Sequence, residues 1–176
     1  MRTLVFLVAL LALSACTAAH SEPGAFELIL IRHAEKLDTS RDPELSEAGR
    51  QRAAWTADWL QNRYIEAIWS SDYKRTRDTA RPLADRLDKD IRIYDAGDLT
   101  ALAAQLRSEK LHALIVGHSN TTPQLAAELC NCEVRPMTDS DYDRAIVIRY
   151  GEDTVEMNEV DQKLLRESDQ GLPPKP

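Results

Sequence analysis

The sequence has too few basic residues to hold a polyanion. Its 22 lysines and arginines stand against 29 aspartates and glutamates, which gives a formal net charge of -7 at pH 7. A broad positive surface is therefore excluded, and with it nucleic acid as a partner. Internal repeats and low-complexity blocks are also missing. The 176 residues are 43% hydrophobic, which is enough for one compact domain and excludes wholesale disorder.

Long hydrophobic runs are equally scarce. One run, Leu4 to Leu13, reaches ten residues of Leu, Val, Phe and Ala, which is too short to span a bilayer and typical of a signal peptide. It ends in Leu13-Ser14-Ala15-Cys16, which resembles the lipobox of bacterial lipoproteins. That resemblance implies a signal peptide over residues 1–15 and a diacylglycerol on Cys16. An ordinary cleaved signal or a buried apolar element stays open as an alternative.

The residues after Cys16 bear on where the protein acts. Residues 16–25 are small and polar with a Pro-Gly pair, as expected for a lipidated cysteine and its tether to a domain. The residue after Cys16 is Thr17, whereas lipoproteins retained at the inner membrane have aspartate there. By resemblance to sorted lipoproteins, Thr17 therefore favours the outer membrane. We therefore expect a protein held to the membrane by the lipid on Cys16, on the periplasmic face of the bacterial envelope and at the outer membrane.

Two further cysteines lie close together at Cys130 and Cys132. An export compartment permits disulfides, but this bridge would close a very small ring. A disulfide and two partly buried thiols are both compatible with the sequence. A metal site is less favoured, because no second pair of cysteines or histidines lies nearby at ligand spacing.

From Phe26 onward, short apolar runs alternate with stretches of helical period, which predicts an α/β fold. We expect a single three-layer domain over residues 26–160, with a mostly parallel sheet flanked by helices and an antiparallel edge strand, followed by a tail over 161–176. The expected strands cover 26–31, 65–69, 91–94 and 112–116, with a terminal hairpin of 144–150 and 154–157. The expected helices cover 46–61, 76–87 with a bend at Pro82, 99–106 and 122–129. The first helix should be capped by Ser46 and bury Ala53, Ala54, Trp55 and Leu60.

Two polar segments directly follow predicted strands. Arg32-His33-Ala34-Glu35 comes after the first strand, and Gly117-His118-Ser119-Asn120 comes after the strand that ends at residue 116. In an open parallel sheet, functional side chains collect past the carboxyl ends of strands. Two of the four histidines in the chain are therefore predicted at the same sheet edge.

These residue types suit phosphoryl chemistry. A neutral imidazole is a competent nucleophile near pH 7, so His33 can attack phosphorus. Arg32 offers a planar guanidinium that can clamp phosphoryl oxygens. Arg75 offers a second clamp at the start of the helix after the second strand, where the helix dipole adds positive charge. Together with His118 these residues predict a compact phosphate pocket.

Four motifs now point to a known family. Residues 30–35, 42–53, 71–80 and 116–121 resemble, in order, the motifs of the histidine phosphatase superfamily with the phosphoglycerate mutase-like fold. The resemblance spans about residues 26 to 157. It implies that His33 is transiently phosphorylated, that Arg32, Arg75 and His118 bind the phosphoryl group, and that no metal or other cofactor is required. It also implies a binding role for Asn120 beside its structural one.

The proton donor for the leaving group is less clear from the sequence. Many family members take an acidic residue from an insertion after the second helix, but here that connection is short and Ile93 stands at the expected place. Asp95 and Glu35 are the candidate general acids, although each also fits a surface carboxylate or a helix cap. This departure brings the chain closer to the short phosphatase branch, which includes enzymes acting on phosphohistidine.

The sequence thus predicts a metal-independent phosphatase of the cell envelope that acts on a small phosphorylated substrate, a phosphomonoester or a phosphohistidine. A phosphate-binding lipoprotein without catalysis is the alternative. Metal-dependent hydrolysis is less favoured, because neighbouring arginines repel a cation. Loops 36–44, 95–100 and 130–143 should set specificity, and alternating aspartates at 139, 141 and 143 should repel a highly anionic substrate.

Overall fold

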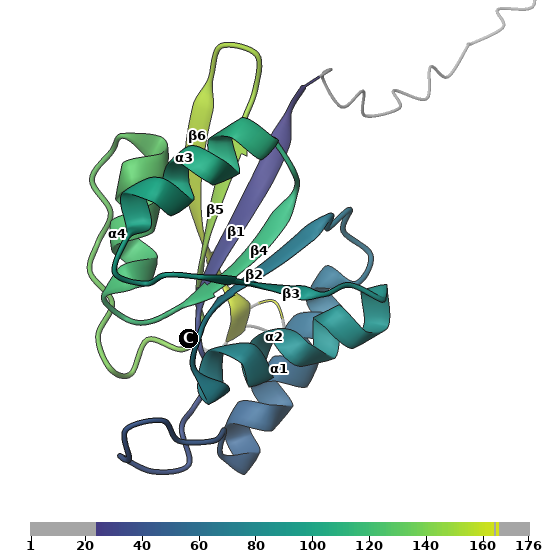
Figure 1. Cartoon of the computed structure of the whole chain (residues 1–176), viewed down its shortest axis with the longest axis vertical. Coiled ribbons are helices and arrows are strands. Elements are labelled where there is room, and N and C mark those ends of the chain that lie inside the picture. Colours follow the sequence, from purple (N-terminus) through teal and green to yellow (C-terminus); the bar gives the residue numbers. More distant parts are fainter. Residues whose placement is uncertain (1–23, 164, 166–176) are drawn as a thin grey trace, which may run out of the picture.

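The computed structural model describes residues 24–163 and 165 (Figure 1). The predicted signal peptide, Cys16, most of the predicted tether and most of the predicted tail lie outside these residues. The strands are β1 (Phe26–Arg32), β2 (Ala67–Ser71), β3 (Ile91–Tyr94), β4 (Ala113–Gly117), β5 (Arg144–Tyr150) and β6 (Val155–Asp161). The helices are α1 (Glu47–Leu60), α2 (Lys74–Leu87), α3 (Leu99–Glu109) and α4 (Thr121–Cys130). None of the described helices is long and apolar enough to cross a membrane.

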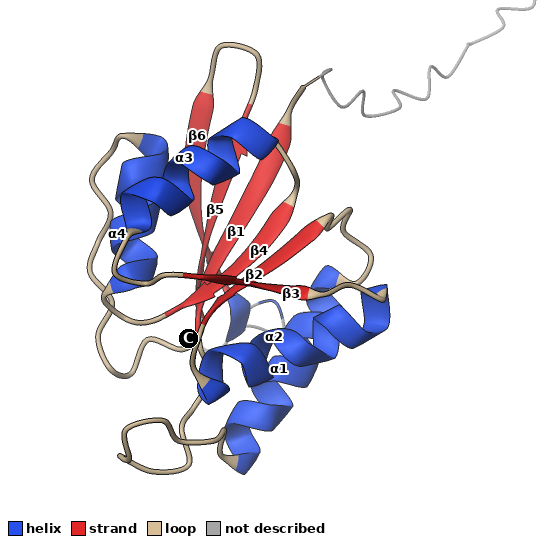
Figure 2. Ribbon diagram, in the orientation of Figure 1, coloured by secondary structure: helices blue, strands red, loops and turns tan. Residues whose placement is uncertain are grey.

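The strands form one mixed sheet in the order β3-β2-β4-β1-β5-β6. The first four of these pair in parallel, whereas β5 runs antiparallel to both β1 and β6. Helices α1 and α2 cover one face, and α3 and α4 cover the other (Figure 2). The predicted fold class, a three-layer α/β domain with an antiparallel edge, is confirmed.

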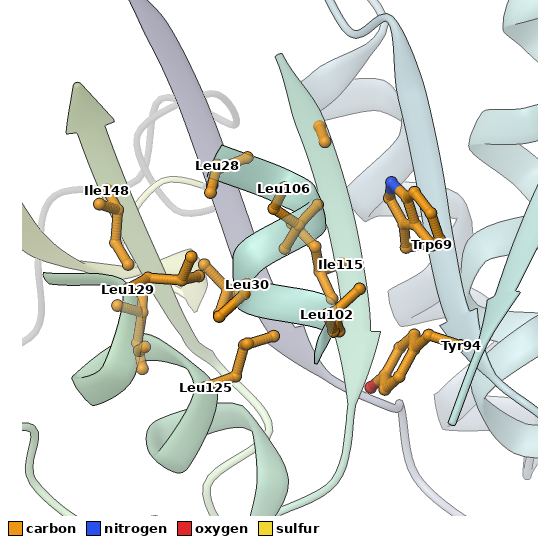
Figure 3. Packing of buried hydrophobic residues seen from close by; sticks show 14 of the residues in the cluster. Leu28, Leu30, Trp69, Tyr94, Leu102, Leu106, Ile115, Leu125, Leu129 and Ile148 are labelled. Carbon is orange, nitrogen blue, oxygen red and sulfur yellow. The ribbon is translucent and has the colours of Figure 1, made fainter. Parts of the chain in front are cut away.

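Alternating side chains of the central strands build two cores. Leu28 and Leu30 pack toward α3 and α4, while Ile29 and Ile31 pack toward α1 and α2. Figure 3 shows the first core, where Leu102 and Leu125 from the helices meet the strand residues. Because β1 and β4 are buried on both faces, their residues read as continuous apolar runs.

The phase of α1 differs from the prediction at two residues. Ala53 and Leu60 are buried and Ser46 caps the helix through the backbone N–H of Gly49, as expected. Ala54 and Trp55, however, are half-buried, and Trp55 stacks on Trp59 at a ring-centroid distance of 6.0 Å. The reason is helical geometry: Ala57 and Leu60 face the sheet core and Ala53 packs on Leu45, so position 55 falls on another side of the helix.

Several element boundaries also differ from the prediction. β2 begins at Ala67 rather than at residue 65, and β6 continues to Asp161 because it pairs along the whole length of β5. α2 begins at Lys74, two residues earlier than predicted, which places Arg75 in its first turn. There the carboxylate of Asp42 accepts a hydrogen bond of 2.9 Å from the Lys74 N–H and supplies the cap that Tyr73 does not.

Cys130 and Cys132 are joined by a disulfide around Asn131, which has left-handed backbone geometry with φ of 51°. The structure therefore realises the first of the two alternatives that the sequence left open. The bridge lies at the C-terminus of α4, where the chain turns into the loop that leads to β5.

Candidate phosphoryl-transfer site

A polar cavity of about 460 Å³ opens past the carboxyl ends of β1, β2 and β4. It brings together five of the seven site residues that the sequence predicted, from the ends of β1 and β4 and the start of α2. Parallel strands make this possible, because Arg32 at the end of β1 pairs in register with Gly117 at the end of β4. The lining residues are Arg32, His33, Lys36, Tyr73, Arg75, Ala96, Gly97, His118, Ser119, Asn120, Thr121 and Asp139.

His33 is held as a neutral imidazole with one free ring nitrogen. Its backbone N–H donates to the carbonyl of Gly117 at 2.9 Å, and its Nδ1 lies 2.7 Å from the carbonyl oxygen of Ala34. A carbonyl only accepts, so Nδ1 carries the proton and Nε2 keeps its lone pair. Burial, reinforced by the positive charge of Arg32, lowers the pKa of His33 to about 3. A nucleophilic nitrogen is therefore available throughout the neutral pH range.

His118 is fixed in the opposite tautomer. Its Nε2 lies 2.9 Å from the hydroxyl oxygen of Ser71, and that hydroxyl donates to Thr76, whose own proton goes to a backbone carbonyl. Ser71 must consequently accept from His118, so Nε2 carries the proton. Nδ1 then accepts from Arg75, whose Nη2 lies 3.4 Å away. Burial and the charge of Arg75 lower the pKa of His118 to about 4.

The two imidazole rings face a common space. Their centroids are 5.5 Å apart and the ring planes are inclined by 66°. Gly117 allows this approach, since a Cβ at that position would lie 2.8 Å from the hydroxyl of Thr122 and 3.0 Å from that of Tyr94. A larger residue would push the segment that carries His118 away from β1.

Arg32 is buried at the floor of the site, with a side chain only 2% exposed. Its guanidinium lies over the ring of Tyr142 at 4.3 Å and donates through Nη1 to the Thr138 carbonyl at 2.8 Å. The remaining terminal nitrogen, Nη2, reaches a carboxylate oxygen of Asp139 at 3.3 Å. Its Nε is buried without a hydrogen-bond partner in the described part of the chain. Arg32 thus combines a fixed orientation with unused capacity to donate.

Arg75 approaches from α2 on the other side. Its guanidinium stacks on Tyr73 at 4.3 Å and lies 3.6 Å from the carboxylate of Asp42. Its side chain is 14% exposed, and its buried Nε has no partner among the residues described. The two arginines place two planar cations around the histidine pair, an arrangement suited to a phosphoryl group.

Both candidate general acids from the sequence lie outside the cavity. The Glu35 carboxylate binds the guanidinium of Arg52 in α1, with oxygen-to-nitrogen distances of 2.6 to 3.0 Å. Arg52 is also paired with Asp143, so Glu35 belongs to a structural ion-pair network. Asp95 accepts a hydrogen bond of 2.8 Å from the N–H of Gly97 and shapes the turn before α3. Both carboxylates therefore already have partners outside the cavity lining, and their role as general acids stays a prediction.

Among the further lining residues that the sequence reasoning did not select, three carry a charge or an aromatic ring. Lys36 directly follows the first motif and brings an exposed ammonium to the cavity, and Tyr73 packs edge-on against His118 with ring centroids 5.0 Å apart. Asp139 comes from the loop before β5. The sequence signal for Asp139 is the acidic alternation at 139, 141 and 143, which by itself indicates repulsion of anions and does not single out one aspartate.

The chemistry of the donors suits an anion better than a cation. Within residues 24–163 and 165, no group of three His, Cys, Asp or Glu side chains is placed to hold a metal ion. The cavity is instead lined by two arginines, one lysine and two imidazoles, with a single carboxylate among them. An oxyanion is the ligand that this combination attracts.

Comparisons with known proteins agree with the site. Residues 28–98 match the model of the histidine phosphatase superfamily (branch 1). No curated protein sequence matches the chain.

Solved structures share the fold. The protein histidine phosphatase SixA in complex with tungstate is 22% identical with a TM-score of 0.64, and the match covers 80% of this chain and 99% of that one. A putative phosphohistidine phosphatase SixA from Nakamurella multipartitia is 21% identical with a TM-score of 0.60, covering 78% and 96%. Mycobacterial glucosyl-3-phosphoglycerate phosphatase is 18% identical with a TM-score of 0.60, covering 77% and 97%.

These likenesses show the fold, and the family match supports phosphatase activity. The matched segment contains Arg32, His33 and Arg75, whereas His118 joins them through the pairing of β4 with β1. The chain thus resembles the histidine phosphatase superfamily over residues 28–98 and shares the fold of these solved structures over the described domain.

Proposed function

We propose that this protein is a metal-independent phosphatase that hydrolyses a phosphomonoester or a phosphohistidine through a phosphorylated His33. The observation that carries the proposal is the pair of oppositely fixed imidazoles between two guanidinium groups in one cavity. His33 has the required lone pair on Nε2, and burial keeps that nitrogen unprotonated.

In the first step, Nε2 of His33 attacks phosphorus while the bond from phosphorus to the leaving oxygen breaks. Arg32 and Arg75 hold the equatorial oxygens and stabilise the charge that they carry in the transition state. The hydrogen bond from Nδ1 to the Ala34 carbonyl strengthens as the ring becomes positively charged. In the second step, water attacks the phosphohistidine in line, inorganic phosphate leaves and Nε2 regains its lone pair.

His118 changes state when a phosphoryl group enters. In the structure its Nδ1 accepts from Arg75. A phosphoryl oxygen beside this nitrogen adds negative charge and raises the pKa of His118, so the ring takes up a proton and donates through Nδ1. Arg75 is then released to donate to the phosphoryl group as well.

The substrate and the location extend the same proposal. The similar solved structures include phosphatases named for phosphohistidine and for glucosyl-3-phosphoglycerate, which supports a phosphorylated small molecule or a phosphoprotein as substrate. The lipobox-like Leu13-Ser14-Ala15-Cys16 supports attachment to the bacterial envelope through a lipid on Cys16, with the domain on the periplasmic side and the outer membrane favoured.

The test is hydrolysis of p-nitrophenyl phosphate by the full-length chain in the presence of a chelator, compared with His33→Ala and with His112→Ala as a histidine control outside the cavity. We expect turnover by the wild type and the control, and loss of at least about 100-fold in His33→Ala. Acid-labile phosphate on the wild-type protein should appear during turnover.

Other outcomes would favour the other hypotheses. Phosphate binding by the folded protein without turnover of any ester would favour a phosphate-binding lipoprotein. Turnover that is lost with chelator and restored by a divalent metal would favour metal-dependent hydrolysis.

A further inference from the structure

The loop before β5 brings one carboxylate to the rim of the site. Asp139 is the single acidic residue among the described residues that line the cavity. Its side chain is 97% exposed, whereas Arg32, to which it is bound, is 2% exposed. A carboxyl group in contact with both water and the phosphoryl-binding cation is placed to exchange protons with solvent and to reach a bound ester.

The backbone around Asp139 is anchored although its side chain is in water. The carbonyl of Thr138 accepts from Arg32 at 2.8 Å, and the N–H of Thr138 donates to Asp141 at 2.7 Å. Two residues earlier, the Pro136 carbonyl accepts from the buried Arg144 at 3.2 Å. The loop therefore holds Asp139 at a fixed place relative to Arg32, and only the carboxylate needs to rotate.

The contact between Asp139 and Arg32 is the one that a phosphoryl group replaces. The distance of 3.3 Å is long for a bond between a guanidinium and a carboxylate, and a single carboxylate oxygen takes part. A phosphoryl oxygen that binds Nη2 of Arg32 displaces this oxygen and leaves the carboxyl group beside the ester. The other two carboxylates considered, Glu35 and Asp95, are committed to Arg52 and Gly97.

We propose that Asp139 is the general acid of the reaction, an inference that rests on the proposed function. As His33 Nε2 bonds to phosphorus and the ester bond breaks, the carboxyl group of Asp139 gives its proton to the leaving oxygen, which departs as an alcohol. In the second step the Asp139 carboxylate takes a proton from the attacking water, and inorganic phosphate leaves. The proton of the first step arrives with the substrate, because phosphate monoesters have a second pKa of about 6.

The leaving group distinguishes this role from a structural one. Nitrophenolate departs readily without a proton, whereas an alkoxide does not. Loss of a general acid therefore slows cleavage of an alkyl phosphate far more than cleavage of p-nitrophenyl phosphate. A change in phosphate binding or in folding would slow both esters alike.

The experiment measures single-turnover cleavage of p-nitrophenyl phosphate and glycerol 2-phosphate by the full-length wild type, Asp139→Asn, Asp139→Glu and the control Asp95→Asn. Asp139→Asn should cleave p-nitrophenyl phosphate within a few-fold of wild type but lose about 100-fold or more on glycerol 2-phosphate. Asp139→Glu should recover part of that loss, and Asp95→Asn should match wild type on both esters.

Equal losses on the two esters in Asp139→Asn would overturn the inference and leave the phosphatase intact. An equal gain on both would also overturn it, since Asp139 would then only compete with substrate for Arg32. Absence of cleavage by the wild type and by every variant would overturn the proposed function and this inference with it.

Discussion

At the scale of single residues, hydrogen bonds behind the two histidines determine which nitrogen can react. Ala34 takes the Nδ1 proton of His33, and Ser71 takes the Nε2 proton of His118. His33 therefore keeps an unprotonated Nε2, whereas His118 presents Nδ1 to Arg75 as an acceptor. The same residue type performs two tasks because its second-layer partners differ.

The low pKa values predict how stability depends on pH. His33 and His118 have pKa values of about 3 and about 4 in the folded protein, below the ordinary 6.5 of an unfolded chain. The unfolded chain thus binds more protons, and the free energy of unfolding should fall as pH drops below 6.5. The slope is at most about 1.4 kcal/mol per pH unit for each histidine.

Urea denaturation at several pH values between 7.5 and 5 measures this slope. His118→Asn should reduce it, because Asn can still donate to Ser71 but does not titrate in this range. A free energy of unfolding that stays constant from pH 6.5 to 5 would contradict the assignment.

A second prediction at this scale concerns binding. If His118 is neutral when the cavity is empty and protonated when an oxyanion is bound, tungstate binding at pH 7 takes up as much as about one proton. Calorimetric titrations in two buffers of different ionisation enthalpy measure this number. His118→Asn should abolish the proton uptake. A wild-type protein that takes up no proton on binding tungstate would show that His118 Nδ1 does not change from acceptor to donor.

The sequence identified residues of the candidate site because each follows a predicted strand. Arg32, His33, Arg75, His118 and Asn120 all line the cavity as expected. The sequence does not predict Asp139 as a site residue, because its loop has no regular period. Hydrogen bonds from Arg32 to Thr138 and to Asp139 hold that loop at the site. The ion pair of Glu35 is hidden in the sequence for a related reason: its partner Arg52 lies 17 residues away, and no sequence pattern shows that pairing.

At the scale of elements, α1 rests on the loop after β1 through a close backbone contact. A methyl group on Gly49 would overlap the carbonyl oxygen of Glu35. That carbonyl also accepts the N–H of Ser46 at 2.9 Å, so the contact fixes the start of the helix next to His33.

Gly49→Ala should therefore destabilise the protein by about 2 kcal/mol, because the overlap exceeds the ~1 kcal/mol that Ala gains over Gly in a helix. Ala48→Gly, at the exposed neighbouring position, is the matched control and should lose only about 1 kcal/mol from helix propensity. Urea denaturation compares the two. A more stable Gly49→Ala protein would mean that helix and loop can separate without cost.

A buried ion pair ties three elements together. Arg52 of α1 binds Glu35 after β1 and Asp143 before β5, and its side chain is 10% exposed. Arg52→Met keeps the side-chain volume but leaves two carboxylates unpaired, so we expect the free energy of unfolding to fall by about 2 kcal/mol. This is less than the full cost for a deeply buried pair, because both acids are partly exposed.

Arg86→Met is the control for this variant. It removes an exposed pair with Asp58 and should cost less than about 1 kcal/mol. Equal losses of unfolding free energy in the two variants would show that the network around Arg52 contributes no more than a surface pair.

The periodicity of the sequence predicted the order of the elements well, because β1 and β4 are continuous apolar runs and the helices carry apolar stripes. The phase of α1 was less predictable. Thr56 and Arg52 are buried by their polar partners Gln162 and Glu35, which hydropathy does not reveal. Trp55 was expected inside on hydrophobicity alone and instead covers Trp59.

At the scale of the whole molecule, ligand binding should be visible as thermal stability. An oxyanion that binds only the folded chain at 100 times its Kd adds about 2.7 kcal/mol, which corresponds to a rise in Tm of roughly 5–10 °C for a domain of this size. Tungstate should produce this rise in the wild type and not in Arg75→Ala. Arg92→Ala, in β3 and outside the cavity lining, should behave as wild type.

The comparison anion is chloride at the same ionic strength, which separates specific binding from screening of the net charge. A similar rise with chloride, or in Arg75→Ala, would show that the cavity does not recognise the oxyanion.

The direction of β1 also governs access to the site. The strand begins at Phe26, near the point where the chain enters the domain (Figure 1). It ends six residues later at Arg32, which lines the cavity. At about 3.3 Å per residue these two ends are roughly 20 Å apart. The proposed lipid on Cys16 would thus attach the domain through the end of β1 that lies opposite the cavity. Attachment at that end would leave the mouth of the cavity clear of the anchor.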